Sequence, residues 1–263
     1  MKHAAVYFLF LFCSFVQSQV KILESNYLST INIEADIYVG CDAFNTHYFL
    51  NNNVLFKKTD VELLQYQNLA LGKVTKVDIS NPLKILLFYQ DFNTIIFLDN
   101  QLNEIQKVDF SNLDVPVVAS AVGISGQNLV WIYNTLNQQI GLYDLVTNKY
   151  NDLGVPIKET FLYYQTDFNY FHWLDSQNQW MSCSIFGRVF SNSTIPYYDK
   201  VQIIDNEKLI YSKNNQLFMI DIKNESVFEI KIVEKTFKNY YYKDQILSIF
   251  TNKGILNYKI NLP

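Results

Sequence analysis

The stretch KILLFYQDFNTIIFLD, residues 84–99, decides the fold of this chain. Two apolar runs, KILLFY and TIIFLD, flank the short polar segment QDFN. Ile, Phe, Tyr and Thr suit the pleated, half-buried surface of a β-strand. Asp and Asn suit tight turns, because their short side chains bond to nearby backbone and tolerate a positive φ. The stretch therefore predicts an antiparallel hairpin whose second strand ends at Asp99.

The same pattern recurs about every forty residues. The other copies are THYFLNNNVLFKKT (46–59), NLVWIYNTLNQQIGLYD (128–144), YFHWLDSQNQWMSCS (170–184), KLIYSKNNQLFMID (208–221) and QILSIFTNKGILNYK (245–259). The first strands end at Leu50, Tyr89, Tyr133, Leu174, Tyr211 and Phe250, which are 39, 44, 41, 37 and 39 residues apart. Another strand precedes each hairpin, and a more polar strand follows most of them. A four-stranded meander of this length is typical of a propeller blade.

Six copies predict one all-β domain, a six-bladed β-propeller over residues 19–263. The last copy has only three strands before Pro263, so we expect the segment YLSTINIE (27–34) to supply its outer strand and close the ring. Closure would leave no exposed sheet edge. A β-sandwich or two smaller β domains are the alternatives, but neither requires such even spacing.

Residues 1–18 are interpreted as a signal peptide. A short positive start precedes the uncharged run AAVYFLFLFCSFV, and Val16 and Ser18 suit the −3 and −1 positions of a cleavage site. No later segment is apolar enough to span a membrane. We expect export to the periplasm, either free or peripherally associated with the outer membrane. In the proposed blades, Cys41 and Cys183 would face each other across the axis, so two unpaired thiols are predicted.

Composition excludes several classes of function. Hydrophobic residues make up 49% of the chain and charged residues 17%, which excludes a disordered chain. The net charge is −4 and Arg188 is the single arginine, so no nucleic-acid partner is expected. His47 and His172 lack the neighbours of a zinc site, and no metal or other cofactor is expected. The aspartates that recur at equivalent turns are interpreted as caps of turn amides, so no catalytic residue is assigned.

The candidate binding residues come from features that break the repeat. The fourth blade is unusually aromatic and holds the arginine, and the sixth carries three consecutive tyrosines. Exposed aromatic side chains suit protein interfaces, since they combine a large contact area with a polar tip. The candidates are Tyr164, Phe168, His172, Arg188 and Tyr241.

The segment VDISNPLKILLFYQDFNTIIFLDNQLNEI, residues 77–105, resembles part of a family of uncharacterised secreted β-propeller-like proteins of Bacteroidota, of a flavobacterial type. This resemblance covers about 30 residues closely and the rest of the chain loosely. It implies a location in the envelope or periplasm of a Gram-negative cell. It carries no catalytic residues over to this chain.

The leading hypothesis is a non-enzymatic module that holds a protein partner in the cell envelope. A rigid ring suits this task because it presents many loops at fixed distances. The alternative is a carbohydrate-binding or hydrolytic propeller with its site at the axial channel, which the fold alone does not exclude. A convergent cluster of carboxylates or histidines at one channel mouth would favour the alternative.

Overall fold

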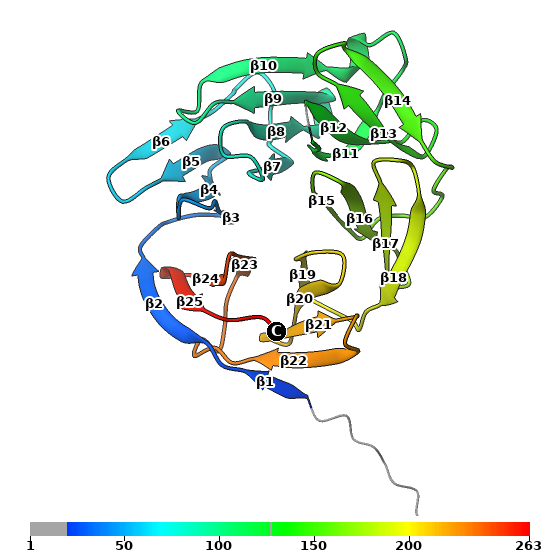
Figure 1. The fold of residues 1–263 in the computed structure, drawn as a ribbon. Coiled ribbons are helices and arrows are strands. Elements are labelled where there is room, and N and C mark those ends of the chain that lie inside the picture. Colours follow the sequence, from blue (N-terminus) through cyan, green and yellow to red (C-terminus); the bar gives the residue numbers. More distant parts are fainter. Residues whose placement is uncertain (1–19, 127) are drawn as a thin grey trace, which may run out of the picture.

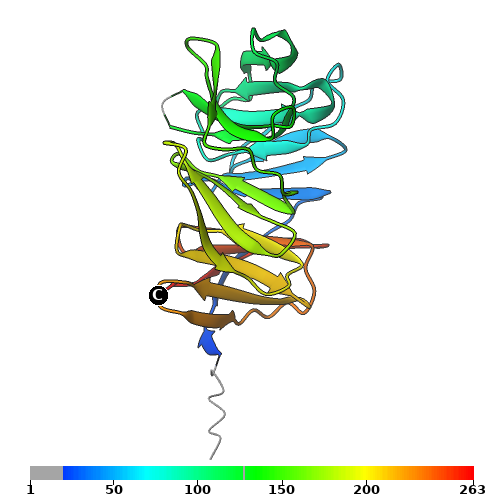
Figure 2. The same cartoon turned by 90° about the vertical axis from the view of Figure 1, so that its right-hand side faces the viewer.

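The structure, a computed structural model, describes residues 20–126 and 128–263. Six β-sheets are arranged radially around a central axis (Figure 1), and their strands run across the thickness of the ring (Figure 2). The predicted six-bladed β-propeller is confirmed. The predicted signal peptide, residues 1–18, lies outside the described residues. Helical structure in the described chain consists of two short 3-10 turns, η1 (Gln90–Phe92) and η2 (Phe110–Asn112).

The first five blades each take four consecutive strands. Blade 1 contains β3 (Ile37–Cys41), β4 (His47–Asn51), β5 (Val54–Lys58) and β6 (Leu63–Tyr66), and blade 2 contains β7 (Lys76–Asp78), β8 (Ile85–Tyr89), β9 (Thr94–Leu98) and β10 (Glu104–Asp109). Blade 3 contains β11 (Ala119–Ile124), β12 (Leu129–Asn134), β13 (Gln139–Asp144) and β14 (Lys149–Leu153). Blade 4 contains β15 (Tyr163–Thr166), β16 (Tyr170–Leu174), β17 (Gln179–Ser184) and β18 (Val189–Thr194), and blade 5 contains β19 (Lys200–Ile203), β20 (Lys208–Lys213), β21 (Gln216–Asp221) and β22 (Ser226–Ile230).

Within each of these blades the first strand lies at the axis and the fourth at the rim (Figure 1). In blade 2 every residue of β8 and β9 is buried, whereas Val108 is the one buried residue of β10. A strand that is covered on both faces has a continuous run of apolar residues, which explains the sequences KILLFY around β8 and TIIFLD around β9. The hairpin turns at Asn93, whose φ of 48° is left-handed and suits Asn.

Six of the seven recurring aspartates cap turns, as the sequence predicts, whereas Asp244 is itself a turn residue with a left-handed φ of 48°. Asp99 Oδ1 accepts hydrogen bonds from the backbone N–H groups of Gln101 and Asn103, both at 2.8 Å. Asp144 Oδ1 likewise accepts from Val146 and Thr147. Equivalent backbone donors reach Asp42, Asp167, Asp205 and Asp221. These carboxylates satisfy turn amides that would otherwise lack a protein partner.

The N-terminal segment closes the ring. Blade 6 consists of β23 (Asn239–Lys243), β24 (Ile246–Thr251), β25 (Gly254–Lys259) and β2 (Asn26–Ile31), which pairs antiparallel with β25. This confirms the expected closing strand, although it ends at Ile31 rather than at residue 34. A second strand, β1 (Lys21–Leu23), pairs parallel with β22 and gives blade 5 a fifth strand. Three residues are too few for an alternating pattern, so sequence analysis did not predict β1.

Apolar clusters fill the spaces between neighbouring blades. Between blades 6 and 1 the buried members are Ala35, Tyr38, Phe49, Phe250 and Ile255, fewer than in the other clusters. Buried polar groups lie beside this small cluster. Ser248 Oγ donates to Asn257 Oδ1 at 2.8 Å, and Tyr38 Oη is hydrogen-bonded to His47 Nδ1 at 2.9 Å. The interface that closes the ring is therefore less apolar than the others.

Cys41 and Cys183 are both buried and free, in β3 of blade 1 and β17 of blade 4. Blades 1 and 4 stand opposite each other in the ring (Figure 1). The predicted pair of unpaired thiols is confirmed for these two residues. The described chain contains no helix that is long and apolar enough to cross a membrane.

We expect Gly254→Ala to destabilise the closing strand. Gly254 begins β25 at a φ of +122°, and a Cβ there would lie 2.3 Å from the carbonyl oxygen of Ile31 in β2. The replacement should lower the free energy of unfolding by about 1–3 kcal/mol. Gly126→Ala is the matched control, because the nearest atom to its Cβ would be 3.7 Å away. Equal stability of the two variants in urea unfolding would contradict this role of Gly254.

We also expect the burial of His47 to make stability depend on pH. Its side chain is 2% exposed, and burial lowers its pKa to about 4, a shift that the carboxylates of Asp42 and Asp60 partly oppose. The unfolded chain, with an ordinary histidine pKa, binds this proton between pH 6.5 and 4 while the folded chain does not. Stability should therefore fall by about 3 kcal/mol as the pH drops through this range.

The measurement for His47 is urea unfolding of the wild type and of His47→Gln at several pH values. Glutamine retains a hydrogen-bonding side chain but cannot titrate, so the variant should lose less stability than the wild type between pH 6.5 and 4. Parallel pH profiles for the two proteins would show that His47 does not cause the dependence.

Candidate functional site

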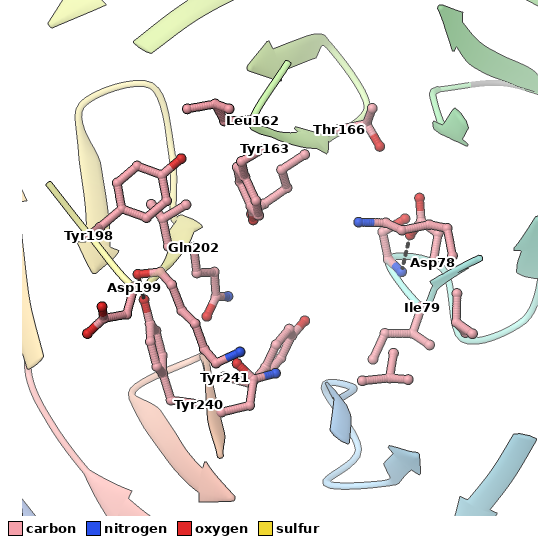
Figure 3. Close-up of a pocket in the computed structure, with 18 residues that line it drawn as sticks. Asp78, Ile79, Leu162, Tyr163, Thr166, Tyr198, Asp199, Gln202, Tyr240 and Tyr241 are labelled. Carbon is pink, nitrogen blue, oxygen red and sulfur yellow. Dashed lines mark hydrogen bonds between the residues drawn. The ribbon is translucent and has the colours of Figure 1, made fainter. Parts of the chain in front are cut away.

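A cavity of about 470 Å³ lies on the axis of the ring. Its walls come from the inner strands and adjoining loops of five blades. The lining residues are Val39 of blade 1, residues 76–80 of blade 2, residues 162, 163, 165 and 166 of blade 4, residues 198–202 of blade 5 and residues 239–241 of blade 6. Figure 3 shows the labelled side chains converging on this space from different blades. Its lining combines tyrosines with amide and charged side chains.

Two glutamines at equivalent positions of neighbouring inner strands join the blades. The Gln165 amide accepts from the Ile203 N–H at 3.0 Å and donates to the Ile203 carbonyl at 2.6 Å. Gln202 forms the same pair of bonds with Tyr242, at 2.7 Å and 2.8 Å. Each glutamine side chain thus takes the place of a neighbouring strand, because it bonds both the N–H and the carbonyl of one residue in the next blade. Because their amide groups are occupied, these side chains shape the cavity but offer few free donors.

The carboxylates of the cavity are occupied by backbone donors. Asp78 is 8% exposed, and its Oδ1 accepts from Ser80 N–H while Oδ2 accepts from Ile124 N–H in blade 3, at 2.9 Å and 2.8 Å. Asp199 Oδ2 accepts from Asn214 N–H at 2.8 Å. The described lining contains no histidine. The arrangement lacks the free pair of carboxylates with which glycosidases protonate a leaving group and attack the sugar.

Lys76 is the half-buried cation of the cavity. Its ammonium lies 4.9 Å from the centre of the Tyr164 ring, within range of a cation–π interaction. No hydrogen bond or ion pair joins this ammonium to the described residues. Burial lowers the pKa of Lys76, and the nearby carboxylate of Asp78 opposes that shift.

The tyrosines of the cavity keep their hydroxyl protons. Burial raises the pKa values of Tyr163, Tyr198 and Tyr241, so that these phenols stay neutral and able to donate. The ring of Tyr241 packs against Gly40 of blade 1, where a Cβ would lie 2.7 Å from the ring. A side chain at position 40 would therefore displace this ring.

A second cavity of about 540 Å³ lies between blades 3 and 4 and shares Leu162 and Tyr163 with the axial cavity. It opens where the chain enters the inner strands, which we call the mouth face; residues 154–162 and 195–199 lie there. Aromatic side chains line it, and the rings of Tyr133 and Phe161 lie 4.4 Å apart. The two cavities are therefore neighbours, with these two residues as a common boundary.

The structure brings two of the five predicted binding residues to these cavities. Tyr241 lines the axial cavity, and Tyr164 lines the cavity between blades 3 and 4. Phe168 is 47% exposed in the turn after β15, at the opposite face. Arg188 lies at the end of blade 4 with its guanidinium 5.8 Å from the ring of Phe190. Binding by any of these residues stays a prediction.

His172 forms a buried hydrogen-bond network in blade 4. Its side chain is 1% exposed, with Nδ1 2.7 Å from Ser182 Oγ and Nε2 3.2 Å from Asp167 Oδ2. Although serine, histidine and aspartate meet here, Ser182 is 0% exposed and also accepts a hydrogen bond from Asn192. A nucleophile must reach its substrate, so this network favours a structural role. Cys183 pairs across the sheet with Phe171 rather than with His172.

Other residues of the site were not predicted, including Lys76, Leu162, Tyr163 and Tyr198. They occupy different blades, and no local motif connects them. The repeat itself was the available signal, since the first strand of a blade is the one that lies nearest the axis. Among residues 20–126 and 128–263, no group of three or more His, Cys, Asp or Glu is placed to hold a metal ion.

Comparison with known proteins supports the fold alone. No protein-family model and no curated protein matches the chain. Among solved structures, a streptogramin B lyase is 14% identical, with 91% of this chain and 98% of the lyase covered and a TM-score of 0.57.

Two further solved structures are similar. A structural genomics protein of unknown function from Bacteroides thetaiotaomicron is 11% identical, with 93% and 74% of the two chains covered and a TM-score of 0.58. YCF48 bound to a D1 peptide is 8% identical, with 94% and 95% covered and a TM-score of 0.54. These proteins share the arrangement of the chain with ours at very low identity, which is a similarity of fold.

Proposed function

We propose that this chain is an exported, non-enzymatic propeller of the cell envelope that binds an extended segment of a partner protein at its mouth face. The observation that carries the proposal is the pair of neighbouring cavities, one between blades 3 and 4 and one on the axis, which share Leu162 and Tyr163. Two adjacent cavities suit an extended ligand, which can reach both of them, better than a compact one.

The linings of these two cavities support binding rather than chemistry. Aromatic rings from Tyr133, Phe161 and Tyr163 offer rigid contact area at a low cost in side-chain entropy. Leu162, at the boundary of the two cavities, is 56% exposed, and Tyr197 beside the axial cavity is 67% exposed. Large exposed apolar side chains near a groove are typical of surfaces that a partner covers. The carboxylates of the axial cavity, Asp78 and Asp199, accept hydrogen bonds from backbone amides.

The alternative is a propeller that binds carbohydrate at the axial cavity. Tyrosine rings and free hydroxyl donors also suit sugar rings, and this observation keeps the alternative open. The fold does not discriminate between a protein-binding and a carbohydrate-binding propeller. Among proteins of similar fold, YCF48 was solved with a peptide, whereas the streptogramin B lyase is an enzyme. A hydrolytic version is less well supported, since Asp78 has both oxygens occupied.

We expect Leu162→Glu to abolish capture of the partner. A charged side chain at this position would oppose insertion of an apolar segment into the groove. Crosslinking in intact cells, followed by purification of the tagged protein, should give a partner band with the wild type and at least a tenfold weaker band with the variant, a loss of about 1.4 kcal/mol or more.

The control for this experiment is Val146→Glu. Val146 is 71% exposed between β13 and β14, on the face away from the mouth, so this variant should capture the partner normally. Equal loss in both variants would show that the mouth face is not the binding surface. Recovery of the wild type without any crosslinked protein would contradict an interaction module. Retention of an oligosaccharide instead of a protein would support the carbohydrate-binding alternative.

A further inference from the structure

The axial cavity offers more hydrogen-bond donors than its own acceptors use. No described residue accepts a hydrogen bond from the ammonium groups of Lys76 and Lys200 or from the hydroxyls of Tyr198 and Tyr241. Lysine can only donate, and a neutral tyrosine donates its single proton. A ligand that fits this lining must therefore be rich in acceptors.

The acidic side chains of the cavity do not compensate for this excess of hydrogen-bond donors. Its charged groups are Lys76, Lys200, Asp78 and Asp199. Both oxygens of Asp78 accept from backbone N–H groups, and Asp199 accepts from one. Neither carboxylate lies within ion-pair distance of a lysine in the described structure. Of the two lysines, Lys76 has the greater need of an anionic partner, because it is half-buried whereas Lys200 is exposed.

A half-buried ammonium without an anionic partner is costly to keep, since burial disfavours its charge. The face of the Tyr164 ring, 4.9 Å away, compensates only in part, as a cation–π contact is weaker than a desolvated ion pair. An anion that entered the cavity would meet this lysine in a poorly solvated setting, where charge-assisted hydrogen bonds are strong. The cavity volume of about 470 Å³ suits a small group rather than a folded domain.

We propose that the axial cavity binds a carboxylate carried by the partner segment, and that Lys76 is its ion-pair partner. This inference rests on the proposed function and names the group that the partner delivers to the axis. The carboxylate belongs either to the C-terminus of the segment or to an acidic side chain within it. An aromatic or apolar residue next to the carboxylate would contact the tyrosines of the lining.

Three short peptides test the carboxylate on the full mature chain by isothermal titration calorimetry. The first is Gly-Gly-Tyr with a free C-terminus, the second is the same peptide as its C-terminal amide, and the third is acetyl-Gly-Asp-Tyr-amide. We expect millimolar binding of the first or the third, which distinguishes a chain end from a side chain. The second should bind at least about tenfold more weakly, because it lacks the anion.

Three variants test the role of Lys76. Lys76→Met keeps the length of the side chain and should weaken binding of the carboxylate peptide about tenfold, whereas Lys76→Arg keeps the charge and should restore most of it. Lys107→Met is the control, because Lys107 is exposed on β10, the outermost strand of the same blade. Thermal unfolding of each variant checks the fold, and the comparison of acid with amide on the wild type needs no variant.

Three outcomes would overturn this inference: equal affinity for the acid and amide peptides, binding by Lys76→Met that matches the wild type, or no binding of any peptide at millimolar concentration. The proposed function fails differently. Loss of crosslinking in Leu162→Glu with equal peptide affinities would retain the interaction module and reject only the carboxylate.

Discussion

The pairing of β2 with β25 is the constraint on which the rest of this structure depends. Blade 6 takes three strands from the end of the chain and its fourth from the beginning, so the ring closes through long-range contacts. Forming such contacts costs more loop-closure entropy than any hairpin within a blade. The addition of β1 to blade 5 fastens the same segment to a second blade. Closure fixes the distance between opposite inner strands and thereby the size of the axial cavity.

The inner strands contact the next blade through three kinds of side-chain interaction. Gln165 and Gln202 satisfy the backbone of the next blade, Asp78 does so for Ile124, and the ring of Tyr241 fills the space above Gly40. These contacts occupy most of the polar side chains that the sequence alone would suggest as catalytic residues. The ammonium of Lys76 and the hydroxyls of Tyr198 and Tyr241 remain without an acceptor among the described residues, and the proposed ligand is inferred from these groups.

The two buried histidines lie in the second strands of their blades, His47 in β4 and His172 in β16. His47 lies neutral beside Tyr38 because burial lowers its pKa, and its charging links the closing interface to pH. His172 is held between Ser182 and Asp167 within blade 4. In both cases the histidine pairs with a neighbour in its own blade, which explains why two histidines far apart in sequence form no common site.

The sequence by itself determined the architecture. Equal spacing of strand ends from Leu50 to Phe250 predicted six blades, the closing strand and the opposed positions of Cys41 and Cys183, because each blade is a local meander whose pattern the chain carries in full. Recurrence also identified Asp99 and Asp144 as turn caps. Only the tertiary structure decided the site. Lys76, Leu162 and Tyr198 come from three blades, and closure of the ring alone makes them neighbours, so no local pattern marks them.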